Sequence, residues 1–340
     1  MSYSYYRFAL QSLALLSLTV LSGLPAPAAP ADFYDQQTIR LIVGTKPGGG
    51  YDALARLLAP EIASLTGASV LVQNKPGAGG LLVVNDAVRG AADGLDLTLV
   101  NVSGAVSAQI IGFEAARFDV RDLKFIGGIA SDDRVILVPA AAPAGSPFLT
   151  PGTVRWSALG KTDNLAISAA LLSEAFGLNS RIITGYGGSG EAITALLRGE
   201  ADAVAVSLES AQAMLGPQTV RIAAVLSRTR SPAAPEVPTV FELADARVDQ
   251  EWLDFLIGLT SLSRSIIVPP GTPAERVDYL ASTIKTALTD ADFIARADAQ
   301  GRSFSYTSPD TVKAEIAAIL ARTHGDNLSR LLNVVLQKYY

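Results

Sequence analysis

From Thr38 onward, short runs of aliphatic and β-branched residues alternate with segments whose apolar residues recur at the 3.6-residue period of an α-helix. The first run is Ile39 to Val43, and the apolar residues that follow it fall on one helical face that stops at Gly67. Another β-branched run begins at Val70. Strands joined by helices pair in parallel, because the helix returns the chain to the same end of the sheet. The pattern therefore predicts an α/β fold.

The same alternation continues through most of the chain. Further strands are predicted at 95–100, 135–138, 181–184, 203–206, 220–225 and 266–268, and further helices at 81–88, 163–176, 191–198 and 252–262. A Pro-rich run, Pro269 to Pro273, begins a last long helix. The Pro-, Ala- and Gly-rich stretch from Ala140 to Gly152 indicates that the chain crosses into a second domain there.

A chain of 340 residues, 49% of them hydrophobic, can bury one large core or two medium ones, and two domains are favoured. We expect residues 32–134 together with 263–340 to form domain 1, and residues 135–262 to form domain 2. The segments 252–262 and 266–268 are expected to carry the chain back to domain 1. Two domains connected in this way have a hinge between them and a cleft beside it.

Residues 1–31 have the features of a secretory signal peptide. Arg7 provides a positive charge, residues 8–24 form an apolar run, and small residues follow in Ala26-Pro27-Ala28 and Ala29-Pro30-Ala31. An uncleaved membrane anchor is the alternative. The apolar run is at the short limit for spanning a bilayer and lacks a basic stop-transfer sequence, which favours cleavage and a soluble periplasmic protein.

Composition excludes several classes of function. The chain has 27 basic and 32 acidic residues, a formal charge of −5, and no concentrated stripe of Lys and Arg, so nucleic acid is not an expected partner. It contains no Cys and a single His, His324, which removes disulfides, thiolate chemistry and nearly every zinc site. We therefore expect no metal, no cofactor and no catalytic residues.

Three glycine-rich loops each follow a predicted strand and precede a predicted helix: Gly44 to Asp52, Asn74 to Gly80, and Gly185 to Glu191. A smaller loop covers Leu159 to Thr162. Backbone N–H groups at the start of a helix are unpaired and lie at the positive end of its dipole, and glycine lets a ligand approach them. Any one loop alone is best explained as a tight turn. Three in one chain favour a site for an anion.

The charged residues in these loops also have structural explanations. Asp52 lies at a helix start, four residues before Arg56, so it is expected to cap the helix and to pair along it. Lys46, Lys75 and Lys161 lie in loops that could face an anion, although a loop lysine is more often merely solvated.

Two glycine patterns resemble nucleotide sites. Gly185, Gly187 and Gly190 satisfy the dinucleotide fingerprint formally, but they occur in the middle of the chain and the expected acid is not at the end of the next strand. Gly160-Lys161-Thr162 imitates the end of a phosphate-binding loop, yet Arg155 stands where that motif has glycine. No G-x-S-x-G element accompanies His324, so a serine hydrolase is not supported.

From about Thr38 to Gly301 the chain resembles the periplasmic solute receptors of tripartite tricarboxylate transporters, also called Bug receptors. The resemblance is carried, in order, by Pro47 to Asp52 with Ala55-Arg56, Val72 to Gly80, Ala92-Asp93-Gly94, Gly185 to Gly188, Leu197 to Asp202, Pro235 to Thr239 and Pro269 to Pro273. The stretch from Leu253 to Ile267 is longer than the family pattern, and Lys46 and Lys75 depart from it. The segment from Asn327 to Tyr340 lies beyond it.

The resemblance implies a two-domain periplasmic-binding-protein fold of the Venus flytrap, type II-like kind. It implies that backbone amides and ordered waters hold the carboxylates of a small ligand, and that a monomeric receptor delivers this ligand to the membrane subunits of the transporter. The candidate ligand-binding residues are Lys46, Gly48, Gly49, Gly50, Tyr51, Asp52, Pro76, Gly77, Ala78, Gly79, Gly80, Ser103, Lys161, Thr162, Tyr186, Gly187, Gly188 and Ser207. A receptor that serves a sensor kinase and, less favoured, a two-domain NAD-dependent oxidoreductase are the alternatives.

The leader is expected to be removed on export, leaving Ala29 or Asp32 as the new N-terminus, because the apolar run ends in small residues. The intact mass of the protein recovered from the periplasm measures this directly. A full-length species in the membrane fraction would contradict cleavage.

Overall fold

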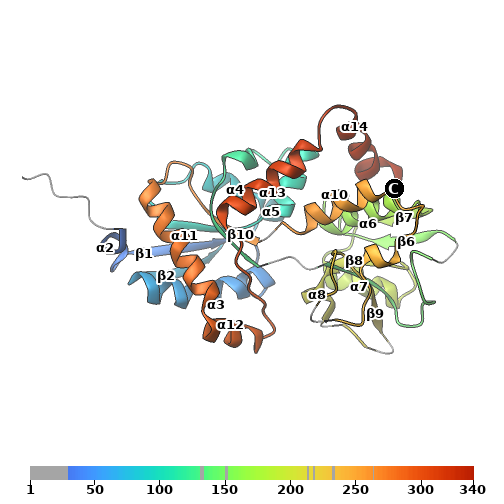
Figure 1. Cartoon of the computed structure of the whole chain (residues 1–340), viewed down its shortest axis with the longest axis horizontal. Helices are drawn as coiled ribbons and strands as arrows, with labels where there is room; N and C mark the ends of the chain where they lie inside the picture. The colour runs from blue at the N-terminus through green and yellow to red at the C-terminus, as the bar shows by residue number, and fades with distance from the viewer. Residues whose placement is uncertain are drawn as a thin grey trace, which may run out of the picture.

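The computed structural model describes residues 30–340 except 131–133, 150–151, 213, 217–218, 232–233 and 263. Two α/β lobes lie side by side along the long axis of the molecule (Figure 1). This is the two-lobed architecture of periplasmic solute-binding proteins. It confirms the fold class that we predicted from the sequence. The expected signal peptide lies outside the described residues, except for its last two positions, which open α2 (Pro30–Tyr34). No helix in the described part of the chain is both long and apolar enough to cross a membrane.

The first lobe is built on a five-stranded sheet with the order β2-β1-β3-β10-β4. Its strands are β1 (Thr38–Val43), β2 (Ser69–Asn74), β3 (Asp96–Asn101), β4 (Lys124–Ala130) and β10 (Arg264–Val268). Strand β1 pairs in parallel with β2 and β3, as expected for strands joined by helices. Strand β10 is antiparallel to both of its neighbours, because the chain enters it from the other lobe.

Helices cover both faces of this sheet. One face carries α3 (Gly50–Thr66), α11 (Ala274–Thr289) and α12 (Ala291–Asp298), and the other carries α4 (Leu81–Ala87), α5 (Val102–Ile110) and α13 (Pro309–Ala321). The short turns η1 (Ala78–Gly80) and η2 (Val120–Asp122) precede α4 and β4. Helix α3 ends at Gly67, as predicted, since this glycine adopts the left-handed conformation and its N–H donates to the carbonyl of Ala63.

The second lobe repeats this strand order. Its strands are β5 (Arg134–Pro139), β6 (Val154–Ser157), β7 (Ser180–Ile183), β8 (Val204–Ser207) and β9 (Val220–Val225), and its helices are α6 (Asn164–Ala175), α7 (Ser189–Leu197), α8 (Leu208–Gln212), α9 (Val240–Leu243) and α10 (Gln250–Thr260). Strand β5 is antiparallel to β8 and β9, while β6 and β7 are parallel. A parallel bridge from Trp156 to Ala203 connects the two sets, so the order is β7-β6-β8-β5-β9.

The chain enters the second lobe before the Pro-, Ala- and Gly-rich stretch, close to the bound between residues 134 and 135 that we expected for the two domains. Strand β5 already pairs within the second sheet, so the crossing lies between the end of β4 at Ala130 and the start of β5 at Arg134. The stretch from Ala140 to Gly152 is a connection inside the second lobe. Its composition identifies a loop, but a loop between strands of one lobe has the same composition as a loop between lobes.

The C-terminal segment crosses a third time. Helix α14 (Gly325–Asn333) and the π-helical turn η3 (Val334–Lys338) lie against the second lobe, close to α6 (Figure 1). The carbonyl of Tyr339 accepts from the N–H of Ile182 at 2.7 Å, and its hydroxyl donates to Glu174 at 2.6 Å. We expected 263–340 to belong entirely to domain 1. Residues 325–340 instead pack on the second lobe, because their apolar pattern specifies a buried face but not the partner that covers it.

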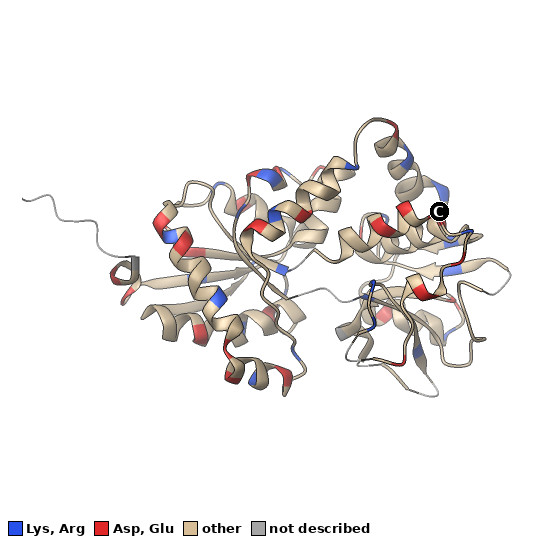
Figure 2. Ribbon diagram, in the orientation of Figure 1, with Lys and Arg blue, Asp and Glu red and all other residues tan. Residues whose placement is uncertain are grey.

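Charged residues are distributed over both lobes. In the view of Figure 2, acidic and basic residues are both scattered over the two lobes. The arrangement agrees with the absence of a basic stripe in the sequence. Attraction of an anion must therefore come from a local arrangement and not from the field of the whole protein.

Candidate functional site

A cleft of about 440 Å³ lies between the two lobes. The first lobe contributes η1 and the beginning of α4, one face of α5 with its N-cap Asn101, and Phe113, which lies shortly after α5. The second lobe contributes the loop before α6. The residues that line the cleft are Ala78, Gly79, Gly80, Leu81, Val84, Asn101, Gly104, Ala105, Ala108, Phe113, Leu159, Thr162, Asp163 and Asn164.

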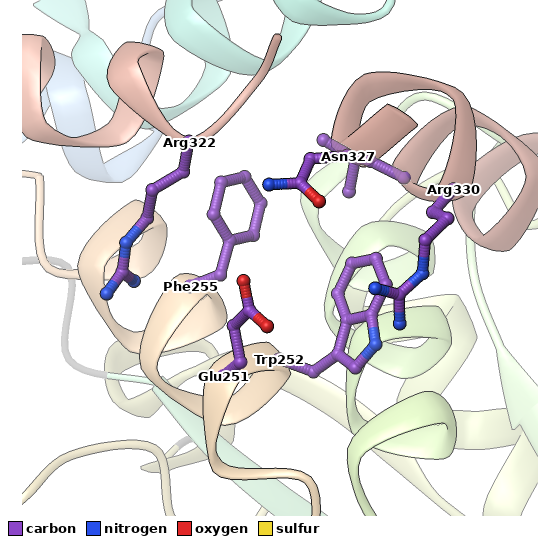
Figure 3. Close-up of a pocket in the computed structure, with 7 residues that line it drawn as sticks. Glu251, Trp252, Phe255, Arg322, Asn327 and Arg330 are labelled. Carbon is purple, nitrogen blue, oxygen red and sulfur yellow. The ribbon is translucent and has the colours of Figure 1, made fainter. Parts of the chain in front are cut away.

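Two other pockets are poorer candidates for the site. One lies where α10 meets the turn between α13 and α14, and is lined by Glu251, Trp252, Phe255, Arg322, Asn327, Arg330 and Leu331 (Figure 3). Its volume of about 30 Å³ holds about one water molecule. The other, of about 440 Å³, is formed by the 139–154 region and Asp202 of the second lobe alone. Of these three pockets, the cleft is the one lined by a glycine-rich loop of the first lobe together with residues of the 159–162 loop of the second lobe.

The second glycine loop presents its backbone to the cleft. Gly79 and Gly80 have φ angles of 66° and 93°, in the left-handed region that favours glycine. A Cβ atom added to Gly79 would meet no other heavy atom within 4 Å, so this position faces open space. On its other side the loop packs closely, because a Cβ atom on Gly44 would lie 2.9 Å from the Cα of Gly80. The second loop therefore packs against Gly44 on one side and faces open space at Gly79 on the other.

The cleft also receives the first residues of α5. The side-chain oxygen of Asn101 accepts from the N–H of Gly104 at 3.0 Å and caps the helix. That bond leaves the NH₂ group of the same amide as a donor. The positive end of the α5 dipole therefore lies at the cleft, beside a neutral donor.

The second lobe offers the start of α6 in a similar way. Asp163 caps this helix, since its Oδ1 accepts from the N–H of Leu165 at 2.7 Å, and its Oδ2 accepts from the N–H of Gly160 at 2.5 Å. Burial raises the pKa of Asp163, and the backbone donors oppose that shift. Thr162 and Asn164, on either side of it, contribute a hydroxyl and a side-chain amide. Of the described residues that line the cleft, Asp163 is the only one with an ionisable side chain.

The first glycine loop is organised by Asp52. Its Oδ2 accepts from the N–H of Gly48 at 2.8 Å and from Nε of Arg56 at 2.9 Å, while its Oδ1 accepts from Nδ2 of Asn74 at 2.9 Å. The hydrogen bond from Arg56 is the main reason that the pKa of Asp52 falls to about 2, although burial opposes the shift. The predicted pairing with Arg56 is present. The cap is not: the N-cap residue of α3 is Gly49 and has no side-chain cap, so Asp52 connects two loops instead.

Several predicted site residues lie outside the cleft lining. Lys46, Gly48, Gly49, Gly50 and Tyr51 belong to the first loop, where the guanidinium of Arg264 lies 4.8 Å from the ring centroid of Tyr51. Pro76 and Gly77 precede the part of the second loop that lines the cleft. The hydroxyl of Ser103 is buried without a hydrogen-bond partner.

The remaining predicted residues are held by their own lobe. The hydroxyl of Tyr186 donates to Glu200 at 3.1 Å, and the N–H of Gly187 donates to Glu191 at 2.6 Å. Gly188 is the N-cap of α7, and Ser207 donates to Ser210 at 2.9 Å. The ammonium of Lys161 donates to the carbonyl of Leu336 at 3.1 Å and lies 4.3 Å from the ring centroid of Tyr340. Ala78, Gly79, Gly80 and Thr162 are the predicted residues that line the cleft.

Most of the apolar lining was missed from the sequence. Leu81, Val84, Ala105, Ala108 and Phe113 are common core residues, and nothing in their spacing distinguishes a cleft wall from a helix–sheet contact. Asn101 had a usable signal, because an asparagine between a predicted strand and a small-residue segment is typical of a helix N-cap. Asp163 had the same signal, at the start of a predicted helix.

Asp52→Asn is expected to lower the free energy of unfolding by roughly 2 kcal/mol at neutral pH, because one of its acceptor oxygens becomes a donor that faces another donor. A depressed pKa contributes stability that is complete above the unfolded value of 3.8 and is lost as the pH falls toward about 2. The difference from wild type should therefore shrink between about pH 4 and pH 2. Urea unfolding across this range measures it.

The matched control is Asp278→Asn, which changes an exposed acid on α11. This variant is expected to unfold like wild type at both ends of the range. An Asp52→Asn protein as stable as wild type at neutral pH would show that the three hydrogen bonds to Asp52 contribute nothing.

Comparisons with known proteins agree with this architecture. The family model described as the tripartite tricarboxylate transporter family receptor matches residues 54–313. Protein BugT of Bordetella pertussis is 28% identical over 329 residues, which cover 92% of this chain and 95% of that protein.

Solved structures share the fold. A TctC solute-binding protein from Polaromonas, solved without ligand, is 23% identical with a TM-score of 0.69, over 90% of this chain and 100% of that one. A protein of R. palustris, solved with adipate, is 19% identical with a TM-score of 0.70, over 87% of this chain and 97% of that one. The family model covers most of the chain, and this chain therefore belongs to the receptor family of the tripartite tricarboxylate transporters.

Proposed function

We propose that this protein is a periplasmic receptor that captures a small carboxylate in the cleft between its lobes and delivers it to the membrane subunits of a tripartite tricarboxylate transporter. It acts as a monomer and catalyses no reaction. The observation that carries the proposal is the cleft itself, in which the starts of α5 and α6 and the backbone of Gly79 and Gly80 meet.

The chemistry of the lining suits a carboxylate. The first N–H groups of a helix lack intrahelical partners and lie at the positive end of the dipole, which favours an anion by about 0.3 to 1 kcal/mol per helix. Asn101, Thr162 and Asn164 add neutral donors around the same space. These donors can bind the carboxylate oxygens without an ion pair, so the ligand can leave again when the lobes open.

The energy required is within reach of such a site. A receptor with micromolar affinity gains about 8 kcal/mol on binding. Three or four hydrogen bonds to a charged group, at about 1.5 to 3 kcal/mol each, supply most of this before the cost of ordering and closing is subtracted. The remainder must come from apolar contact with the ligand body.

The alternatives make different use of the same fold. A receptor that reports to a sensor kinase would bind its ligand in the same cleft, and the genes beside this one distinguish the two roles. Neighbouring genes for two membrane subunits favour transport, and a neighbouring sensor kinase favours signalling. An oxidoreductase would hold a dinucleotide at the third glycine loop, where the N–H of Gly187 instead donates to Glu191.

A thermal-shift screen of the mature protein against mono-, di- and tricarboxylates tests the proposal. A ligand at a hundred times its dissociation constant adds about 2.7 kcal/mol of stability by mass action. Nicotinamide dinucleotides belong in the same screen. If a dinucleotide raises the melting temperature and no carboxylate does, the receptor function is wrong.

Gly79→Val is expected to abolish carboxylate binding, because its side chain would project into the open space in front of the second loop. Strain at a φ of 66° should cost roughly 1 to 3 kcal/mol of stability without unfolding the lobe. Calorimetric titration with a carboxylate that the screen returns, beside a melting curve, measures both effects.

Gly177→Val is a matched control, because Gly177 has a φ of 60° and also has no heavy atom within 4 Å of an added Cβ, but it lies outside the cleft. Gly177→Val should lose about as much stability as Gly79→Val but should bind the carboxylate with wild-type affinity. Wild-type affinity in Gly79→Val would remove the second loop from the site.

A further inference from the structure

The cleft is polar at one end and apolar along its length. Asn101, Gly104, Ala105 and Ala108 line it from α5 at the spacing i, i+3, i+4 and i+7, which is one face of a helix. At a rise of 1.5 Å per residue, this face extends the lining by about 10 Å from the polar N-terminus of the helix toward its C-terminus. The far end is completed by Phe113, which follows α5.

The cleft wall between the N-terminal end of α5 and Phe113 is formed by apolar side chains. Leu81 and Val84, one turn apart on α4, also line the cleft, and Leu159 lines it from the second lobe. Phe113 is 39% exposed, although its N–H is anchored by a 2.9 Å hydrogen bond to the carbonyl of Ala108. A large aromatic ring that is left partly open to solvent is a surface that an apolar ligand group can cover.

A second carboxylate has no partner at the apolar end. The C-terminal half of the α5 dipole is negative and disfavours an anion there. None of the described residues that line the cleft is basic, so no side chain there can offset the charge of a second carboxylate. A second carboxylate on the ligand would lose its hydration without gaining a compensating charge.

We propose that the ligand of this receptor is a monocarboxylate with an apolar body, whose carboxylate lies at the N-terminal end of α5 and whose body lies along Ala105 and Ala108 to Phe113. The inference rests on the proposed receptor function and assigns its ligand class. Phe113 is the residue that selects for the apolar body.

The test compares hexanoate with adipate, which has the same carbon chain and carries a second carboxylate, by calorimetric titration of the mature protein. Phenylpropionate is a third probe, with an aromatic body. Hexanoate or phenylpropionate is expected to bind at least about tenfold more tightly than adipate, because the second carboxylate of adipate would lose its hydration at the apolar end without a compensating charge. Tighter binding of adipate, or of citrate, would contradict the proposal of a monocarboxylate ligand but would still agree with the proposed receptor function. If no carboxylate binds, the receptor function itself fails, and this inference fails with it.

Variants at Phe113 test whether the apolar end of the cleft determines the preference for hexanoate over adipate. Phe113→Ala should weaken hexanoate binding by about tenfold and leave the weak adipate binding nearly unchanged. Phe113→Lys places a cation at the apolar end and should shift the preference toward adipate. Leu149→Ala, a change at an exposed apolar residue outside the cleft lining, is the control and should bind like wild type. Equal losses for hexanoate and adipate in Phe113→Ala, or an unchanged preference in Phe113→Lys, would overturn the role of Phe113.

Discussion

Each lobe depends on a strand that the chain forms immediately after it arrives from the other lobe. Strand β5 follows the first crossing and lies between β8 and β9, and strand β10 follows the return and lies between β3 and β4. Both are antiparallel to their neighbours and are almost entirely buried. Neither sheet is complete without its crossing strand, so the chain connects the two lobes through interior strands of both sheets. The cleft exists because of this constraint.

The C-terminal segment, which lies beyond the residues 54–313 that the family model matches, adds a further connection between the lobes. Lys161, which precedes the cleft residues Thr162 and Asp163, donates to the carbonyl of Leu336, and its own carbonyl accepts from the hydroxyl of Tyr340. The final residues therefore hold the second-lobe loop that lines the cleft. Lys161, which the sequence suggested as a direct ligand contact, instead donates its hydrogen bond to the C-terminal segment.

The sequence was sufficient for the architecture, because periodicity and glycine position report local structure directly. The strand at 38–43, the helix that ends at Gly67 and the helix start at Asp163 could all be predicted. Which lobe covers a segment could not be predicted, and for this reason residues 325–340 were assigned to domain 1 although they pack on the second lobe. The site was predictable only where a loop signal and the cleft coincide, as at Gly79. Phe113 and Ala108 carry no such signal, because their role comes from where α5 lies relative to the second lobe.

The most direct measurement is a crystal structure of the mature protein with a carboxylate that stabilises it in solution. The account predicts that the carboxylate oxygens lie within hydrogen-bonding distance of backbone N–H groups of the Ala78–Gly80 loop or of the starts of α5 and α6, with residues of both lobes in contact with the ligand. A ligand bound to one lobe alone, such as at the third glycine loop, with the cleft left open to solvent, would contradict it.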